Sequence, residues 1–346
     1  LITLFEAQGS TYRKPGAKMV VDHAGEYVGT ISGGCLETDV TLYAQKVIQS
    51  QRNQIIHYNL TDDLVLGLGL GCGGSISLLI EQDIEGWLPV VLSKYSESVL
   101  VKLLGDVEGK EQPRTLYVYN NGNFIWQDHN QPLDKEAMEL LEAGCRSALS
   151  ERMCLLKELH LRGKQTRVYF DYIEPAQELI IFGAGDDALP VATLGQQLHF
   201  QVTVIDYKPV NLEEPRFQGC RKLLWNESEQ PLPPLNKRTA VVIMSHHVQR
   251  DAQALETFRA QDIEYIGLLG PKHRLQRLEE HFKQLTLEEI KRDKRIYSPV
   301  GLDIGSETPA EIAVSILSEI IAVRNKARGM SLRKKECAIH HFSSPL

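Results

Sequence analysis

The feature that most constrains the fold is the apolar run at residues 179–182, which leads directly into the sequence Gly-Ala-Gly-Asp-Asp-Ala at 183–188. Further apolar runs follow, each with a helical or loop segment behind it. They lie at residues 202–205, 240–244 and 265–269. This alternation is typical of a parallel sheet with covering helices. We therefore predict a doubly wound α/β domain over residues 178–330.

The turn at 183–188 matches the GxGxxG/A sequence that opens dinucleotide-binding βα units, which makes the predicted domain Rossmann-like. Gly183 allows a tight turn, Gly185 lets a pyrophosphate approach the backbone, and Ala188 lets the helix pack closely on the strand. Asp206 ends the next apolar run, where a carboxylate binds the 2′-hydroxyl of a ribose. NAD or another adenine nucleotide is therefore the expected ligand, in preference to NADP.

Two carboxylates, Asp186 and Asp187, follow the second glycine of this turn. A helix N-terminus favours anions, so these side chains would compete with a phosphate for the same place. The alternative is a doubly wound domain that keeps its shape without binding a nucleotide, because a fold does not establish a ligand.

Other strand ends are expected at the same edge, since ligands of open α/β sheets bind outside the carboxyl ends of the strands. His246 follows one apolar run and is a candidate for contacting a ligand, moving a proton or binding a metal; an ordinary loop histidine is the alternative. Lys272 and Arg274 follow the next run. Their charges predict an anion site, with a solvated basic helix face as the alternative.

A late helix is predicted after Thr308, because Thr308 and Glu311 form a capping-box sequence with Pro309 at the first helical position. Its apolar residues keep helical spacing and form either part of the core or the seam of a dimer. They are Ile312, Ile316, Ile320 and Val323. We also expect a homo-oligomer.

The N-terminal part, residues 1–172, has a mixed pattern that predicts an α+β domain, with an amphipathic helix at residues 36–49. The predicted strands lie at 1–6, 19–22, 27–32 and 75–81. The short polar segment 171–177 contains a proline and is the best boundary before the Rossmann-like domain. Residues 331–346 are expected to form a tail.

Six cysteines are scattered along the chain without a CxxC pair or zinc-site spacing, so structural disulfides and structural zinc are not expected. One of them, Cys35, follows Gly33 and Gly34 and falls at the N-terminus of the predicted helix. Free backbone N–H groups and the helix dipole stabilise a thiolate there, the form of cysteine that acts as a nucleophile and binds metals.

A second cysteine, Cys72, has Gly71 before it and Gly73 and Gly74 after it, within a longer glycine-rich run. So many glycines exceed what a turn requires and raise the entropy cost of folding. A ligand or a close backbone approach is the expected reason. The alternative for both Cys35 and Cys72 is a buried cysteine in a tight turn.

Charge and hydropathy exclude some classes of protein. The net charge of −7 disfavours nucleic-acid binding, which needs a dense footprint of Lys and Arg. No apolar run approaches the ~20 residues that cross a bilayer, and no basic-then-apolar leader opens the chain. We expect a cytoplasmic protein with no membrane span and no nucleic-acid partner.

Several longer sequences occur together along the chain. They are GSTYRKPGAKM at 9–19, SGGCLE at 32–37, GLGCGG at 69–74, GAG at 183–185, GLLG at 267–270 and SPVGLDIGSETPAEIA at 298–313. In this order they resemble the xanthine dehydrogenase accessory factor (XdhC/CoxI) family over nearly the whole chain. The resemblance implies an N-terminal domain with the cysteine motifs and a C-terminal Rossmann domain. It also implies that the chain binds the molybdenum cofactor (molybdopterin) and inserts it, in sulfurated form, into xanthine dehydrogenase or a related molybdenum hydroxylase of purine catabolism. A cysteine desulfurase is the implied sulfur donor.

Under that resemblance, Cys35 and Cys72 are expected to bind molybdenum through the cofactor or to relay sulfur, since a soft thiolate suits this metal. Arg13 and Lys14 are expected to neutralise the phosphate of the cofactor. Some positions depart from the residues usual in the family. They are Tyr12 in place of proline, Asp186 in place of histidine and Lys208 in place of arginine.

Two other classes stay open: an NAD(P)-dependent oxidoreductase, and a non-catalytic scaffold for maturation of the hydroxylase. A dehydrogenase would pair its dinucleotide turn with a clear acid/base group, and here only His246, His247 and Asp251 follow a strand end. A pure scaffold would not need cysteines embedded in glycines. The favoured prediction is an accessory factor rather than a stand-alone enzyme.

Overall fold

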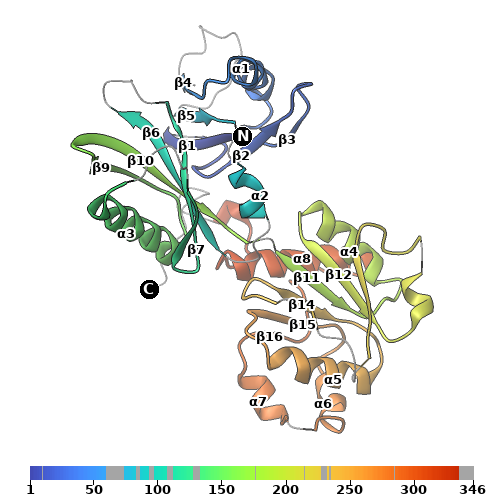
Figure 1. Ribbon diagram of the computed structural model, residues 1–346. Coiled ribbons are helices and arrows are strands. Elements are labelled where there is room, and N and C mark those ends of the chain that lie inside the picture. The colour runs from blue at the N-terminus through green and yellow to red at the C-terminus, as the bar shows by residue number, and fades with distance from the viewer. Residues whose placement is uncertain are drawn as a thin grey trace. The chain divides into compact units, whose positions relative to one another are not determined.

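The chain divides into two compact units, Leu1–Pro175 (unit 1) and Ala176–Leu346 (unit 2) (Figure 1). The last strand of unit 1, β10 (Lys164–Ile173), ends shortly before β11 (Glu178–Phe182) begins unit 2. That each unit folds independently stays a prediction. The computed structural model describes residues 1–9, 11–59, 74–82, 86–92, 97–106, 112–127, 133–175, 177–213, 215–226, 232–233, 235–283 and 285–334.

The first sheet of unit 1 has the strand order β3-β2-β1-β5-β4, with antiparallel neighbours. Its strands are β1 (Ile2–Gly9), β2 (Lys18–Val21), β3 (Tyr27–Gly29), β4 (Gln54–Asn59) and β5 (Gly74–Ile80). Helix α1 (Glu37–Ser50) packs on one face, because its apolar residues, such as Val40 and Val47, meet Leu4 and Leu78 of the strands. The predicted helix and strands of this region are confirmed, except that β3 ends at Gly29 instead of residue 32, and β4 is an addition.

The second sheet of unit 1 has the antiparallel order β8-β7-β6-β10-β9. Its other strands are β6 (Ser98–Asp106), β7 (Arg114–Asn120), β8 (Asn123–Gln127) and β9 (Leu155–Leu161). A short helix, α2 (Trp87–Leu92), precedes the sheet, and α3 (Lys135–Glu151) packs on it. Gly144 of α3 permits this packing, because a Cβ there would collide with the ring of Phe170.

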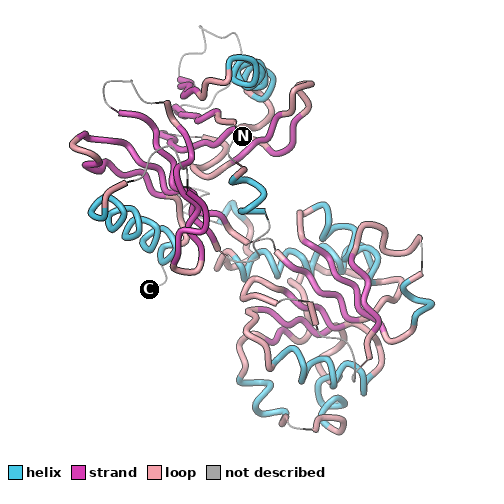
Figure 2. Tube along the Cα trace, in the orientation of Figure 1, coloured by secondary structure: helices cyan, strands magenta, loops and turns pink. Residues whose placement is uncertain are grey.

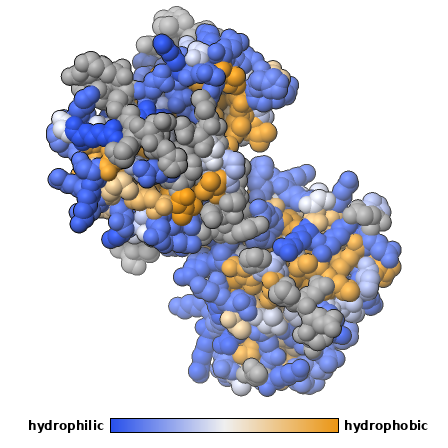
Figure 3. All heavy atoms as spheres, in the orientation of Figure 1, coloured by the Kyte–Doolittle hydropathy of each residue, from blue (hydrophilic) through white to orange (hydrophobic). Residues whose placement is uncertain are grey.

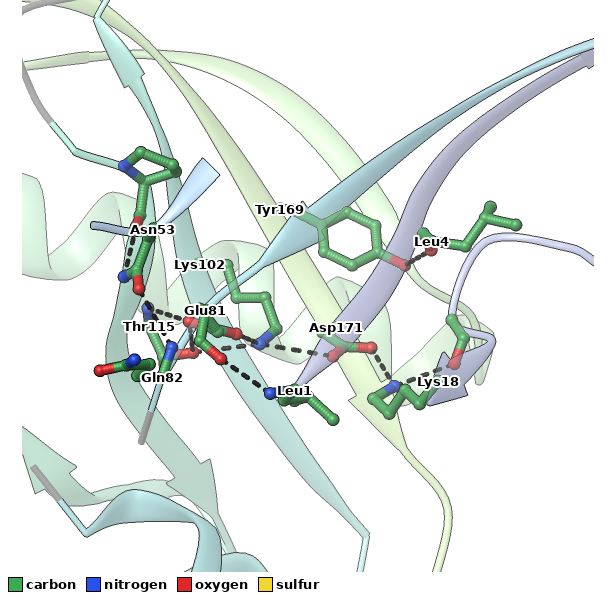
Figure 4. Close-up of polar contacts among 12 residues, drawn as sticks. Leu1, Leu4, Lys18, Asn53, Glu81, Gln82, Lys102, Thr115, Tyr169 and Asp171 are labelled. Carbon is green, nitrogen blue, oxygen red and sulfur yellow. Dashed lines mark hydrogen bonds and ion pairs between the residues drawn. The ribbon is translucent and has the colours of Figure 1, made fainter. Parts of the chain in front are cut away.

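A buried ionic network lies between the two sheets of unit 1, with Lys102 between Glu81 and Asp171 (Figure 4). Lys102 forms an ion pair with Glu81, whose carboxylate also accepts the backbone N–H (2.8 Å) and hydroxyl (2.9 Å) of Thr115. Asp171 binds the ammonium of Lys18 at 2.7 Å and lies 4.0 Å from that of Lys102. The two lysines balance the charge of the two carboxylates. A single ion buried here without a partner would strongly destabilise the fold.

Unit 2 contains a parallel sheet whose described strands have the order β13-β12-β11-β14-β15-β16. The strands after β11 are β12 (Gln201–Asp206), β13 (Arg221–Leu224), β14 (Ala240–Ile243), β15 (Tyr265–Leu268) and β16 (Ile296–Tyr297). Helices cover both faces (Figure 2). One face carries α4 (Ala188–Gln197) and α8 (Pro309–Arg324), and the other carries α5 (Val248–Arg259), α6 (Arg274–Glu279) and α7 (Leu287–Arg292). Short 3-10 turns lie at η1 (Pro209–Leu212) and η2 (Leu332–Lys334). The doubly wound prediction is confirmed.

Helix α8 begins with the predicted capping box, in which Thr308 accepts from the backbone of Glu311 and Glu311 accepts from the backbone of Thr308. Its apolar stripe belongs to the core of unit 2, since Ile316 and Ile320 are buried there and the other two residues of the stripe pack against the same cluster. The stripe therefore supports α8 against the sheet. The homo-oligomer stays a prediction.

Hydrophilic residues dominate the visible face of each unit, with smaller hydrophobic areas among them (Figure 3). Among the described residues, none of the helices has the length and apolar character that a bilayer crossing requires. Exposed apolar side chains include Val28 on the edge strand β3 and Tyr12 in the loop after β1.

Candidate functional site

The SGGC sequence lies in the loop at residues 30–36, called here the SGGC loop, which joins β3 to α1. Glu37 begins α1 and is buried, with 1% of its surface exposed. One of its carboxylate oxygens accepts hydrogen bonds from the backbone N–H groups of Ile31 (3.2 Å) and Ser32 (2.9 Å). Those N–H groups do not pair with another strand, which explains why β3 ends earlier than predicted.

The other carboxylate oxygen of Glu37 serves the start of α1. It accepts the hydroxyl of Ser32 at 2.5 Å and the backbone N–H of Leu36 at 3.2 Å. Burial acts to raise the pKa of Glu37, but hydrogen bonds from Ser32 and from nearby backbone N–H groups outweigh it, so the pKa lies below its usual value. Glu37 therefore fixes the SGGC loop as an ionised side chain, a role that the sequence analysis did not assign.

Cys35 is half-exposed, and its Sγ lies 3.5 Å from the hydroxyl oxygen of Ser32. The N–H of Leu36, next to Cys35, donates to the Ser32 hydroxyl and to the Glu37 carboxylate. Support of a Cys35 thiolate by free N–H groups of the helix start stays a prediction. The thiol keeps partial access to solvent, and Gly34 beside it has a φ of 105° with open space where a Cβ would lie.

Tyr12 lies against the SGGC loop. A Cβ on Gly33 would lie 3.5 to 3.6 Å from three atoms of the Tyr12 ring, and 67% of Tyr12 is exposed. Arg13 and Lys14 follow Tyr12 and are exposed. The structure therefore places the loop that carries the two predicted phosphate ligands in contact with the loop that carries Cys35.

The second cysteine motif is only partly described. Cys72 lies outside the described residues, as do Gly71 and Gly73. Gly74 is described: it begins β5 and pairs with Gly9 at the end of β1. The motif therefore rejoins the sheet beside the strand end from which the loop of Tyr12 departs.

Other cysteines lie in different surroundings. Burial raises the pKa of the Cys145, Cys154 and Cys220 thiols, and at Cys154 the carboxylate of Asp171, 3.7 Å away, raises it further. These three are free thiols, as is Cys35. Their environments disfavour the thiolate, so they are poor candidates for ligands.

In unit 2, the predicted dinucleotide turn lies between β11 and α4. Gly183 has a φ of 115°, and a Cβ there would lie 2.6 Å from the backbone of Ser245, so only glycine fits. A Cβ on Gly185 would lie 2.6 Å from a carboxylate oxygen of Asp187. That carboxylate occupies the space where a pyrophosphate was expected to approach.

Both carboxylates of this turn have partners. Oδ2 of Asp187 lies 2.7 Å from Nε2 of His246, an exposed residue with a φ of 59°. Arg216 donates to Asp186 at 2.9 Å and to the carbonyl of Ala184 at 3.0 Å. Arg216 was not predicted, because it lies far from the turn in sequence. Among the described residues, His246 included, no group of three or more His, Cys, Asp or Glu side chains could hold a metal ion.

Asp206 ends β12 as predicted, but it is buried, with 3% of its surface exposed. One oxygen accepts the backbone N–H of Ala184 at 2.7 Å. The other accepts the backbone N–H of Lys208 at 2.8 Å and the side-chain amide of Asn211 at 3.2 Å. A ribose hydroxyl would have to share these oxygens, so the role of Asp206 as a ribose ligand stays a prediction.

The anion site predicted after β15 stays a prediction, and one of its two cations already has a partner. Arg274 forms an ion pair with Asp251, whose side chain is fully buried, while Lys272 is exposed. Asp251 also accepts the hydroxyl (2.5 Å) and the backbone N–H (3.2 Å) of Ser245. Arg274 therefore neutralises a carboxylate of its own chain, because a buried charge needs a partner.

Known proteins resemble the chain along most of its length. A protein-family model described as "XdhC Rossmann domain" matches residues 179–320. A second family model, described as "XdhC and CoxI family", matches residues 1–59. A protein of Bacillus subtilis named as a probable xanthine dehydrogenase subunit is 31% identical over 94% of this chain and 93% of its own length. The molybdenum cofactor insertion chaperone PaoD of Escherichia coli is 24% identical over 94% of this chain and 83% of its own length.

A solved structure has the same architecture. The crystal structure of a xanthine dehydrogenase from Bacillus halodurans matches with a TM-score of 0.70 and 28% identity, covering 96% of this chain and 93% of that one. Together with the glycine-flanked Cys35, the GAG turn and the parallel sheet of unit 2, these likenesses confirm the family that the sequence motifs predicted. The chain belongs to the XdhC and CoxI family.

Proposed function

We propose that this protein is an accessory factor that binds the molybdenum cofactor as cargo and inserts it into a molybdenum hydroxylase of the xanthine dehydrogenase type. The observation that carries the proposal is the similarity to the insertion chaperone PaoD, which extends over 94% of the chain. The similarity to a probable xanthine dehydrogenase subunit supports the class of client enzyme. The cytoplasm is the proposed compartment, and a homo-oligomer is the proposed assembly.

The proposed cargo site is the surface of unit 1 where Tyr12 contacts the SGGC loop. Arg13 and Lys14 supply positive charge for a phosphate, and Gly34 leaves the backbone open beside the Gly33 that the Tyr12 ring faces. Cys35 supplies a half-exposed soft ligand. The site thus offers cations for the phosphate of the cofactor and a thiol for its metal.

Cys72 is proposed as the second sulfur group of the site. It lies two residues before Gly74, which pairs with Gly9 at the start of the Tyr12 loop. In a sulfurated cofactor pathway, Cys35 and Cys72 would relay sulfur delivered by a cysteine desulfurase.

Binding of NAD or another adenine nucleotide by unit 2 is a separate proposal. The arrangement of the turn does not fit a pyrophosphate as it stands, because the Asp187 carboxylate fills the space beside Gly185 and repels an anion. Nucleotide binding therefore requires Asp187 and His246 to move away. A dehydrogenase role has less support than the accessory role for the same reason.

Reconstitution tests the proposed function. Purified chain loaded with molybdenum cofactor is mixed with apo xanthine dehydrogenase, and hydroxylase activity is followed against free cofactor at the same concentration. We expect faster and more complete activation with the loaded chain, and loss of that advantage with Cys72→Ser. Equal activation by free cofactor and loaded chain would leave no insertion function to explain.

A further inference from the structure

One face of the Tyr12 ring is turned toward Gly33 of the SGGC loop. The position of a Cβ on Gly33 lies 3.6, 3.5 and 3.6 Å from the consecutive ring atoms Cγ, Cδ2 and Cε2. If the Cβ lay beyond the edge of the ring and in its plane, it would be clearly nearer to Cδ2 than to Cγ and Cε2. Nearly equal distances to three consecutive atoms therefore place Gly33 over one face of the ring.

The other face of the Tyr12 ring is open to solvent, since 67% of the residue is exposed. A Cβ on Gly33 would make ordinary van der Waals contact with the ring, so this side of the ring faces the SGGC loop with space for about one methyl group between them. An exposed aromatic ring with one side toward the loop and the other toward solvent is a platform for a flat heteroaromatic ring, because offset stacking is favoured between such groups.

The neighbours of this platform differ in chemistry. Arg13 and Lys14 follow Tyr12 and are exposed, so they carry positive charge on the same loop. Cys35 lies two residues after Gly33, and its thiol is half-exposed. A ligand that combines a flat ring, a phosphate and a thiophilic metal would find a matching group for each part.

We propose that Tyr12 stacks on the pterin ring of the cargo, with Arg13 and Lys14 on the side of its phosphate and Cys35 on the side of its metal. The proposal rests on the proposed function and assigns the recognition of the pterin to one residue.

Binding of two probes to the full chain tests the stacking contact: free pterin, which has neither phosphate nor metal, and the intact molybdenum cofactor. Tyr12→Leu should weaken the binding of both by about ten-fold, the size of a lost base–aromatic stack. Tyr12→Phe keeps the ring and should bind both like the wild type. Arg13→Ala should weaken only the cofactor, because free pterin has no phosphate.

Tyr27→Leu is the matched control, since Tyr27 is another exposed tyrosine, on strand β3. Unchanged binding by Tyr27→Leu together with weakened binding by Tyr12→Leu supports the proposal. Equal binding of both probes by Tyr12→Leu and the wild type overturns the stacking contact and leaves the proposed function standing. Failure of the wild type to bind the cofactor overturns both.

A second measurement separates stacking from a structural role of Tyr12 in its loop. Tyr12→Trp keeps a flat ring and adds a fluorophore at the platform. Stacking predicts that free pterin quenches this added fluorescence and that the variant binds as tightly as the wild type. Unquenched fluorescence at saturating pterin would contradict the contact even if Tyr12→Leu had lost affinity.

Discussion

At the level of single residues, the ligands that the candidate site can accept depend on which of its groups already form hydrogen bonds within the protein. The carboxylate of Glu37 accepts the N–H of Leu36 at the start of α1, while the neighbouring Cys35 thiol is half-exposed. In unit 2, Asp187 takes the space beside Gly185 in the same way. In each place an acidic side chain of the chain itself uses backbone groups or space that a ligand would otherwise occupy.

Cys35→Ser should lower the affinity for the molybdenum cofactor at least about ten-fold, because even outer partners of a metal site carry effects of that size. Cys220→Ser is the control, since burial raises the pKa of that thiol and it lies in unit 2. Equilibrium dialysis of the cofactor measures both variants. Wild-type affinity in Cys35→Ser would remove this thiol from the site.

Asp187→Asn should increase nucleotide binding by unit 2, because it removes a negative charge beside Gly185 while keeping the size of the side chain. A ligand that binds only the folded state raises the midpoint of thermal unfolding. We expect a larger shift with millimolar NAD for the variant than for the wild type. An equal NAD-induced shift of the unfolding midpoint in variant and wild type, or a larger shift with NADP than with NAD, would contradict this role of Asp187.

At the scale of elements, parallel strands were easier to predict than antiparallel ones. The strands β11 and β14 are buried on both faces, so they read as continuous apolar runs bounded by glycine and polar residues. In the second sheet of unit 1, Lys102 of β6 and Asp171 of β10 are buried in the ionic network and interrupt the apolar pattern. Their partners come from distant strands, which one sequence does not reveal.

The candidate site was predictable only as far as local sequence determines it. The sequence indicated the turn before α1 and the glycines around Cys35, because glycine spacing and helix periodicity are local. It did not indicate that Glu37 would close the turn, or that His246 would pair with Asp187 from another strand end. Such pairings depend on tertiary structure.

Glu37→Gln should destabilise unit 1 by about 1 to 3 kcal/mol at pH 7, because the amide oxygen replaces only one carboxylate oxygen and the NH2 group would face backbone N–H donors of the SGGC loop. The pKa of Glu37 is lowered by folding, so its contribution is complete above the usual value of 4.5 and is lost as the pH falls below it. Urea unfolding of both proteins should therefore show a difference in free energy that narrows below about pH 4.5. A difference that grows in acid would contradict this role.

At the scale of the whole molecule, the chain combines a cysteine-bearing unit with a Rossmann-like unit. The surface of unit 1 carries the proposed cargo site. At the strand ends of unit 2, acidic side chains pair with basic side chains of the same unit, as Asp187 does with His246 and Asp251 with Arg274. This division suggests that cargo binding and any nucleotide binding are separable functions of the two units.

Limited proteolysis should cut first between Ile173 and Glu178, because β10 ends and β11 begins there and junctions between units are preferred cleavage sites. We expect fragments close to the sizes of unit 1 and unit 2 that resist further cleavage, as seen by mass spectrometry. Fragments that degrade as soon as they form would show that the units do not fold independently.

Titration of the purified full chain with the molybdenum cofactor tests whether unit 1 binds this cargo. We expect saturable retention after desalting that weakens in Tyr12→Leu and Cys35→Ser and stays unchanged in Cys220→Ser. Retention that never saturates, or that is the same in all four proteins, would contradict it.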